Sequence, residues 1–214
     1  MTKLKSDDIR EIMRRFKENN PNPECELDWK SPYTLLVSVV LSAQATDKSV
    51  NLATAPLFAK YDTPEKILEL GIDGLIPYIK PIGLYNNKAK NIIALSKELI
   101  EDFSSVVPDK LEDLMKLSGV GRKSANVVLN VAFKQKTMPV DTHIFRVSRL
   151  VGLSDGENVN EVEQDLLKCI PDEYLLHAHH WILLHGRYVC KARKPNCENC
   201  LIKDICKSNT MEGK

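Results

Sequence analysis

The sequence is poor in aromatic residues, in net charge and in long apolar runs. Aromatic residues make up 6% of the 214 residues, hydrophobic residues make up an ordinary 43%, and the formal net charge is +1. The longest apolar stretch, at 33–45, is interrupted by serines and is too short to span a bilayer. The N-terminal residues include Asp7 and Asp8 and contain neither an apolar signal core nor an Arg-rich transit pattern. We therefore expect an ordered, soluble protein of the cytoplasm that has no membrane partner.

Signals for β-strands are also missing, so the sequence predicts an all-α fold. Short β-branched runs such as 37–41 fall inside segments of helical periodicity. A chain of this length can bury one large core or two modest ones, and the Asn- and Pro-rich segment 19–23 is a candidate domain crossing. The predicted helices cover 6–19, 32–44, 47–57, 74–79, 86–99, a segment from 108 to 117, and then 122–132, 142–151, 158–170 and 172–186.

A glycine-containing turn at 117–121 separates two of these predicted helices. The segments before and after it carry apolar residues at helical spacing. Gly119 and Gly121 permit a tight turn, because they have no Cβ and tolerate unusual backbone angles. A helix–hairpin–helix of this kind, at about 111–133, directs free backbone N–H groups at the start of its second helix toward an anion such as a DNA phosphate. An ordinary turn between two packed helices is the alternative.

Two basic residues, Arg122 and Lys123, occupy the first turn after this hairpin. A helix start disfavours a cation, and partial burial of Lys123 in a cleft would further favour the neutral, nucleophilic amine. Asp141 precedes another apolar-periodic run, where its simplest role is a helix N-cap. Beside a phosphate-binding turn, an amine and a carboxylate suggest amine attack on a sugar carbon, with Asp141 assisting the proton transfers. A solvated or phosphate-pairing Lys123 is the alternative.

Charge is unevenly distributed along the chain. Residues 119–149 contain six basic residues and one acidic residue, a net charge of +5, whereas residues 155–173 contain seven acidic residues and one basic residue, a net charge of −6. Such asymmetry is typical of a protein that binds a polyanion on one face. Chance patchiness on a charged surface is the alternative.

Four cysteines, Cys190, Cys197, Cys200 and Cys206, lie close together near the C-terminus with the spacing C-x6-C-x2-C-x5-C. A disulfide framework does not fit a protein without a leader, so the spacing indicates a closed metal site. Zinc and an iron–sulfur cluster both stay open, because the first gap is long for a zinc finger and matches no ferredoxin pattern. That gap contains the basic residues Lys191, Arg193 and Lys194. The histidines 177, 179 and 180 lack partners at ligand spacing, so we expect them to pack between helices.

Five motifs in this order resemble the endonuclease III family of DNA glycosylases and abasic-site lyases. They are LSAQATD (41–47), GLYNNKA (83–89), LSGVGRKSANVVLN (117–130), VDTHIFRV (140–147) and HGRY (185–188). Together with the cysteine spacing, the resemblance extends over nearly the whole chain, from about residue 19 to residue 206. It implies a [4Fe–4S] cluster in the loop 190–206, with the four cysteines as ligands. It also implies two helical domains with a central cleft: a six-helix barrel at 23–135, and a cluster domain made of 1–22 and 136–214.

The resemblance further implies a function in base excision repair. Lys123 would be the nucleophile and Asp141 its catalytic partner on double-stranded DNA with oxidised or ring-saturated pyrimidines or abasic sites, and we expect a monomer. Leu84 would act as a wedge in the base stack, and Gln44 would fill the space left by the extruded nucleotide. The residues that contact DNA would be Gln44, Leu84, Gly119, Gly121, Arg122, His143, Lys191, Arg193 and Lys194. Two alternatives stay open: a monofunctional mismatch glycosylase of the same fold, and a non-catalytic DNA-binding module with a structural metal.

Overall fold

The computed structural model describes residues 3–211, and these form eleven α-helices without a β-strand. The predicted all-α fold is therefore confirmed. The helices are α1 (Ser6–Asn19), α2 (Pro32–Leu41), α3 (Asp47–Phe58), α4 (Pro64–Ile79), α5 (Tyr85–Phe103), α6 (Leu111–Leu114), α7 (Arg122–Val131), α8 (Thr142–Val151), α9 (Val159–Cys169), α10 (Leu175–Tyr188) and α11 (Lys207–Met211). In this part of the chain, no helix combines the length and the apolar character that crossing a membrane requires.

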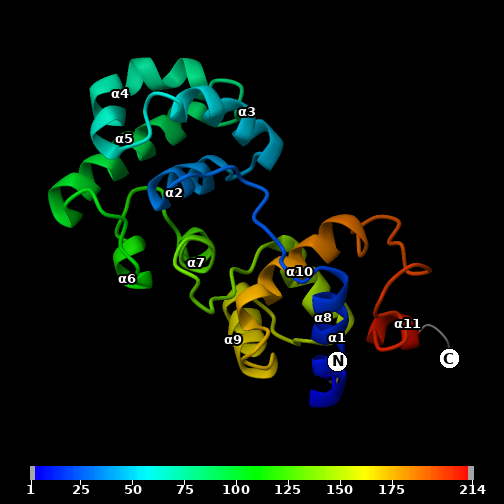
Figure 1. The fold of residues 1–214 in the computed structure, drawn as a ribbon. Helices are drawn as coiled ribbons and strands as arrows, with labels where there is room; N and C mark the ends of the chain where they lie inside the picture. Colours follow the sequence, from blue (N-terminus) through cyan, green and yellow to red (C-terminus); the bar gives the residue numbers. More distant parts are fainter. Residues whose placement is uncertain (1–2, 212–214) are drawn as a thin grey trace. The chain divides into compact units, whose positions relative to one another are not determined.

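The chain divides into two compact units (Figure 1). One unit is continuous and covers Cys25–Gln135. The other is discontinuous and joins the described residues up to Glu24 to those from Lys136 onward. Each unit has its own hydrophobic core.

The core of the continuous unit is built around α2. Ser31 starts this helix with a capping box shared with Thr34, and Pro32 occupies the first helical position. Every residue from 33 to 41 is buried, as predicted for a helix that is apolar nearly all round. Helices α3, α5 and α7 pack against it.

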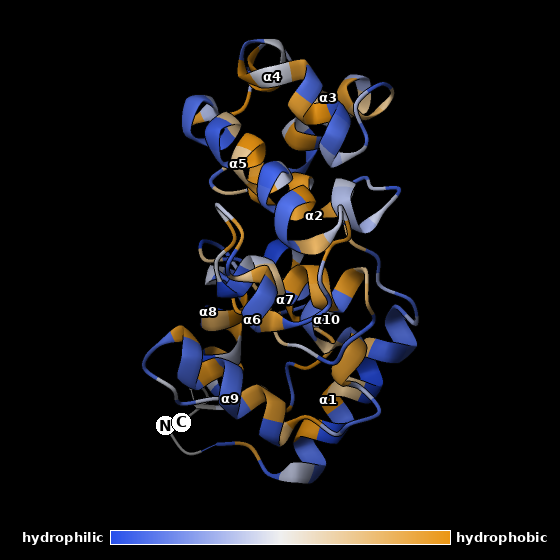
Figure 2. Cartoon of the chain, turned by 90° about the vertical axis from the view of Figure 1, so that its left-hand side faces the viewer, coloured by the Kyte–Doolittle hydropathy of each residue, from blue (hydrophilic) through white to orange (hydrophobic). Residues whose placement is uncertain are grey.

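Helix α4 is kinked and α5 is long. Gly71 has a φ of 69°, so α4 consists of two helical pieces that meet at this residue. Helix α5 follows after Leu84 and buries Ile92, Leu95 and Leu99 on one face while its other faces are polar (Figure 2). This amphipathic helix is the support for the hairpin turn described below.

The discontinuous unit packs α1, α8, α9 and α10 around the second core. Helices α8 and α10 approach closely at Gly186, where a Cβ would lie 3.0 Å from His143 Cβ and from Val147 Cγ2. The indole N–H of Trp181 donates to the carbonyl of Asn20 at 2.8 Å, which ties the end of α1 to α10. The N-terminal helix is thus an integral part of this unit.

Candidate functional site

The predicted helix–hairpin–helix consists of a single turn of helix, α6, a tight turn and α7. Leu117 and Val120 are buried in the turn, and Gly119 has a φ of 78°, in the left-handed region that favours glycine. Gly121 is the N-cap of α7 and offers no side chain to the helix start. Helix α6 begins at Leu111 and not at Pro108: residues 106–108 have no regular secondary structure, a bend follows at 109–110, and only one helical turn precedes the hairpin.

Lys123 lies in the first turn of α7 and is exposed, so the predicted partial burial of this residue was wrong. The reason is its position on the helix. Every residue of α7 from Ala125 to Val131 is buried, whereas the first turn, which contains Lys123, lies at the surface end of the helix. Arg122 beside it is half-buried.

Asp141 is the N-cap of α8, as its position in the sequence predicted. Its Oδ1 accepts hydrogen bonds from the backbone N–H groups of His143 and Ile144, both at 2.9 Å. Its Oδ2 lies 3.0 Å from Nδ1 of His143. Both side chains are partly exposed, so the carboxylate and the imidazole form an accessible polar pair at the start of α8.

Leu84 and Gln44 share an unusual backbone conformation. Their φ values are 60° and 53°, which non-glycine residues rarely adopt. Both side chains are exposed, and 57% of Leu84 is accessible even though it is a large apolar residue. Tyr85, which we also expected on this exposed turn, is half-buried against the first core, because it begins α5.

The four predicted cysteine ligands surround one hollow, which Val151, His185, Val189 and Ile202 also line. All four are free thiols; Cys197 is exposed and the other three are half-buried. Burial raises the pKa of the Cys190 and Cys200 thiols. Repulsion from neighbouring cysteine thiolates raises the pKa of Cys190 and Cys200 further, so a bound cation would favour the thiolate form of these two residues.

Four cysteine thiolates can hold either a zinc ion or an iron–sulfur cluster. Zinc would require all four sulfurs within about 2.3 Å of one point. The histidines 177, 179 and 180 make ring contacts within their own helix, α10: His177 with Trp181, and His179 with His180.

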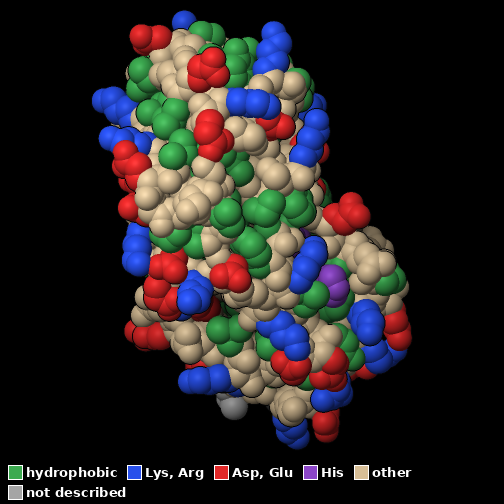
Figure 3. Space-filling view, turned by 60° about the vertical axis from the view of Figure 1, so that its left-hand side comes forward, with side chains coloured by type: hydrophobic (Ala, Val, Ile, Leu, Met, Phe, Trp, Pro, Cys, Tyr) green, Lys and Arg blue, Asp and Glu red, His purple; other side chains and the backbone are tan. Residues whose placement is uncertain are grey.

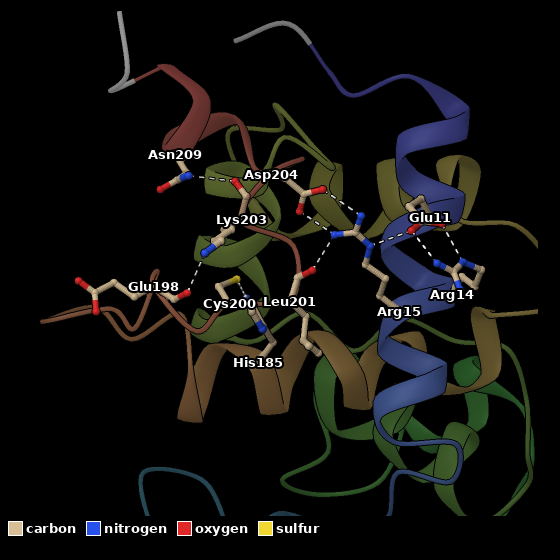
Figure 4. Close-up of polar contacts among 10 residues, drawn as sticks. All are labelled: Glu11, Arg14, Arg15, His185, Glu198, Cys200, Leu201, Lys203, Asp204 and Asn209. Atoms are coloured by element: carbon tan, nitrogen blue, oxygen red, sulfur yellow. Dashed lines mark hydrogen bonds and ion pairs between the residues drawn. The ribbon is translucent and has the colours of Figure 1, made fainter.

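His185 lies against the cysteine site, and no feature of its sequence position predicted a contact with a thiol. Its Nε2 is 3.8 Å from Sγ of Cys200 (Figure 4). Burial lowers the pKa of His185 to about 4, so the ring is neutral at neutral pH. A neutral imidazole beside Cys200 can donate its N–H to the sulfur without adding a charge.

Two arginines from distant helices hold the cysteine loop. Arg15 of α1 donates to the carbonyl of Leu201 at 2.8 Å and to both carboxylate oxygens of Asp204 at 2.6 and 2.9 Å (Figure 4). Arg146 of α8 donates to the carbonyls of Gly186 and Cys190 at 3.0 and 2.7 Å. Sequence reasoning missed Arg15, because its partners are 186 and 189 residues away.

The basic residues of the first gap, Lys191, Arg193 and Lys194, are all exposed. Lys194 has a φ of 53°, and the backbone N–H of Asn196 donates to the carbonyl of Val189 at 3.0 Å. The segment is therefore a short, closed arm whose charged side chains face solvent.

A helical fold with a glycine hairpin and a four-cysteine loop defines a class of DNA repair protein. The model of the HhH-GPD superfamily base excision DNA repair proteins matches residues 37–172, and that of the iron–sulfur binding domain of endonuclease III matches residues 190–206.

Relatives and solved structures agree with this class. Endonuclease III of Rickettsia conorii is 60% identical over 92% of this chain and 94% of its own length, and that of Escherichia coli K12 is 54% identical over 92% and 93%. A solved structure of a trapped endonuclease III–DNA covalent intermediate superposes with a TM-score of 0.91 at 42% identity, and it covers 99% of this chain and 100% of that chain. The chain belongs to the endonuclease III family, and its cofactor is a [4Fe–4S] cluster.

Proposed function

We propose that this chain removes oxidised or ring-saturated pyrimidines from duplex DNA and cleaves the strand at the resulting abasic site, with Lys123 as the nucleophile. The observation that carries the proposal is the exposed primary amine in the first turn of α7, directly after the hairpin. A phosphate bound at the hairpin would bring a deoxyribose within reach of this amine. A related endonuclease III has been trapped as a covalent intermediate with DNA.

Binding would begin with the phosphates. The N–H groups of Gly119 and Gly121, the Arg122 side chain, the imidazole of His143 and the basic arm of Lys191, Arg193 and Lys194 would contact the backbone, with an affinity that falls as salt rises. The exposed side chains of Leu84 and Gln44 would enter the base stack and support a kinked duplex. Extruding the damaged nucleotide costs a few kcal/mol, and least for a base that stacks badly, which contributes to selectivity.

The chemistry would follow from amine attack. After giving up a proton, Nζ of Lys123 forms a bond to C1′ of the deoxyribose, and the bond between C1′ and the base breaks, so that the base leaves with the electron pair and takes up a proton. The nitrogen then loses a proton as the sugar ring opens to an imine. The imine acidifies C2′, and loss of a C2′ proton breaks the C3′–O bond and so cleaves the strand on the 3′ side. Asp141 would assist these proton transfers.

The iron–sulfur loop would serve DNA docking and not the chemistry. Binding of Cys190 and Cys197 to one cluster would fix both ends of the basic arm. The arm would then hold its conformation before it contacts the phosphates and would lose less conformational entropy on binding. We propose domain limits of 23–135 for the barrel and of 1–22 with 136–214 for the cluster domain. We also propose that the protein acts as a monomer, in the cytoplasm, on the DNA of the nucleoid.

Borohydride trapping tests the nucleophile. Wild-type protein should form a reduced covalent adduct with a duplex that carries an abasic site, whereas Lys123→Gln should form none, because glutamine has no amine to make the imine. Lys97→Gln, which changes an exposed lysine of α5, is the matched control and should be trapped like the wild type. Trapping of Lys123→Gln would remove Lys123 from the mechanism. A wild type that binds DNA without trapping would favour a monofunctional glycosylase or a DNA-binding module.

A further inference from the structure

The turn of the hairpin is held by the long helix that precedes it in the sequence. The carboxylate of Glu98, on α5, accepts two hydrogen bonds from Ser118: one from the backbone N–H at 2.7 Å and one from the hydroxyl at 2.6 Å. Both oxygens of one carboxylate thus grip a single residue of the turn. Hydrogen bonds to an ionised acceptor are shorter and stronger than those between neutral groups, so this contact restrains the turn firmly.

A second contact with α5 lies at the next residue of the turn. A Cβ on Gly119 would lie 2.8 Å from Nδ2 of Asn91 and 2.9 Å from its Cβ. Asn91 and Glu98 are seven residues apart, about two turns or 10 Å along one face of α5. The turn therefore rests on a single face of this helix through two successive residues.

This contact also decides which backbone amides of the turn are occupied. The N–H of Ser118 donates to Glu98, and the N–H of Val120 donates to the carbonyl of Leu117 at 3.1 Å. In the part of the chain that the structure describes, the N–H groups of Gly119 and Gly121 donate to no protein acceptor. These two amides are the donors that an incoming anion would find.

We propose that Glu98 is a positioning residue for DNA binding: its carboxylate fixes the hairpin in the shape that receives a phosphate before DNA arrives. The inference rests on the phosphate-binding role proposed above for the hairpin. A carboxylate near a polyanion site ordinarily weakens binding. Here both of its oxygens are occupied by donors, and a turn that is ordered in advance loses less conformational freedom on binding. The ordering effect therefore outweighs the repulsion.

A double-mutant cycle tests the proposal. The variants are Glu98→Ala, Ser118→Ala and the double variant, and the measurement is the Kd for a duplex with an uncleavable abasic-site analogue. Glu98→Ala removes both hydrogen bonds and should raise Kd about tenfold. Ser118→Ala removes only the hydroxyl bond and should raise Kd by less, because its backbone N–H still donates to Glu98. The double variant should bind no more weakly than Glu98→Ala, because that substitution has already removed the hydroxyl contact. The cleavage rate at saturating DNA should stay within about twofold of wild type, since Glu98 does not contact the reacting atoms.

Three further variants separate positioning from charge and from folding. Glu101→Ala removes a carboxylate one turn further along α5, where it pairs with Lys97 at 3.7 Å, and should bind DNA at least as tightly as wild type. Ser118→Thr keeps both donors and should retain the wild-type Kd. Glu98→Gln preserves the side-chain shape and one acceptor, so its Kd should lie between those of the wild type and Glu98→Ala. If Glu98→Ala fails to fold, the Kd of Glu98→Gln tests whether the carboxylate positions the hairpin.

Two results would overturn the proposal: Glu98 variants that bind DNA as tightly as wild type or more tightly, and additive effects in the cycle. Failure of the proposed function would look different. In that case the wild-type protein itself would neither bind the analogue duplex nor form a borohydride adduct.

Discussion

Asp141 caps helix α8 with one carboxylate oxygen and presents its other oxygen to the His143 ring. One of its oxygens accepts both backbone N–H groups at the start of α8, while the other lies beside the His143 ring. The capping role predicted from the sequence is confirmed, and the role in proton transfer stays a proposal. The two roles can be separated, because asparagine caps helices about as well as aspartate but carries no charge.

Asp141→Asn should therefore leave the fold intact and slow the reaction. We expect a loss of at least ~10²-fold in the single-turnover rate on abasic-site DNA, the size of a general acid–base contribution. The thermal midpoint should stay close to that of the wild type, since the cap is preserved. A rate near that of the wild type would leave the N-cap as the only role of Asp141.

The contacts of Asp165 predict how the stability of the discontinuous unit changes with pH. Its carboxylate accepts hydrogen bonds from Lys3 Nζ at 2.8 Å and from Ser154 Oγ at 2.6 Å. Burial acts to raise the pKa of Asp165, but the hydrogen bonds from Lys3 and Ser154 outweigh it, and the pKa lies below its ordinary value. A carboxyl with a lowered folded-state pKa stabilises the fold above its ordinary pKa, and this stability is lost as the pH falls through the lowered value.

Asp165→Asn should consequently lower the thermal midpoint at pH 7. The difference from the wild type should shrink below about pH 4, the ordinary range of an aspartate, because the wild-type carboxyl then takes up its proton as well. Thermal unfolding followed by circular dichroism between pH 7 and the acid limit of solubility measures this, with the exposed Glu157→Gln as control. A difference of the same size at every pH would contradict the assignment.

At the scale of elements, α1 is joined to the cysteine loop through Arg15. This side chain donates to Leu201 and Asp204 of the loop and, at 2.8 Å, to Glu11 of its own helix. Among the residues that the structure describes, the neighbouring Arg14 pairs with Glu11 and Glu18, both in α1. The two adjacent arginines therefore form a matched pair, of which one reaches the loop and the other does not.

Arg15→Ala should loosen residues 201–204 and expose the cluster to attack. We expect the visible absorbance of the cluster to bleach roughly fivefold faster in the presence of an iron chelator, which corresponds to about 1 kcal/mol for a partly exposed ion pair. Arg14→Ala should bleach at the wild-type rate. Equal rates for the two variants would show that the contact of Arg15 does not protect the loop.

Local signals predicted most helices but not their irregularities. Ser31 and Pro32 mark the start of α2, and the glycine hairpin marks the start of α7, because these are short-range rules of capping and turn formation. The first half of α4 was missed although Thr63 caps it, since the change of direction at Gly71 interrupts its apolar pattern. Helix α11 was also missed, because a segment of five residues, four of them polar, carries no periodicity.

Much of the candidate site was recognisable from spacing, whereas its supports were not. The four cysteines and the turn at 117–121 are compact in sequence, so their proximity follows from chain geometry. Glu98 is 20 residues from Ser118, and Arg15 is 189 residues from Asp204. Contacts of this kind depend on which helix faces pack together, and that is decided by the whole core.

At the scale of the whole molecule, local charge and not net charge should control DNA affinity. The net charge is +1, and basic and acidic side chains are interspersed on the face shown in Figure 3. Lys191, Arg193 and Lys194 are exposed on one short arm of the chain. If they contact phosphates, each contact releases counterions from the DNA. The slope of log Kd against log salt is then proportional to the number of such contacts.

Alanine at Lys191, Arg193 or Lys194 should reduce the slope of log Kd against log salt by about 1 for each residue replaced. Fluorescence anisotropy at several salt concentrations measures the slope. Lys168→Ala, in the acidic segment 155–173, is the control and should leave the slope unchanged. An unchanged slope in the triple variant would remove this arm from the DNA interface.

The discontinuity of one unit also sets an order for biosynthesis. Cys25–Gln135 is contiguous and can fold on the ribosome as soon as it has emerged. Helix α1 is made first but must wait for its partner, because Arg15 precedes Leu201 by 186 residues. At about 5–20 residues per second, this wait lasts roughly 10–40 s. Until then the contact that ties α1 to the cysteine loop cannot form, so this helix waits longest for its partner.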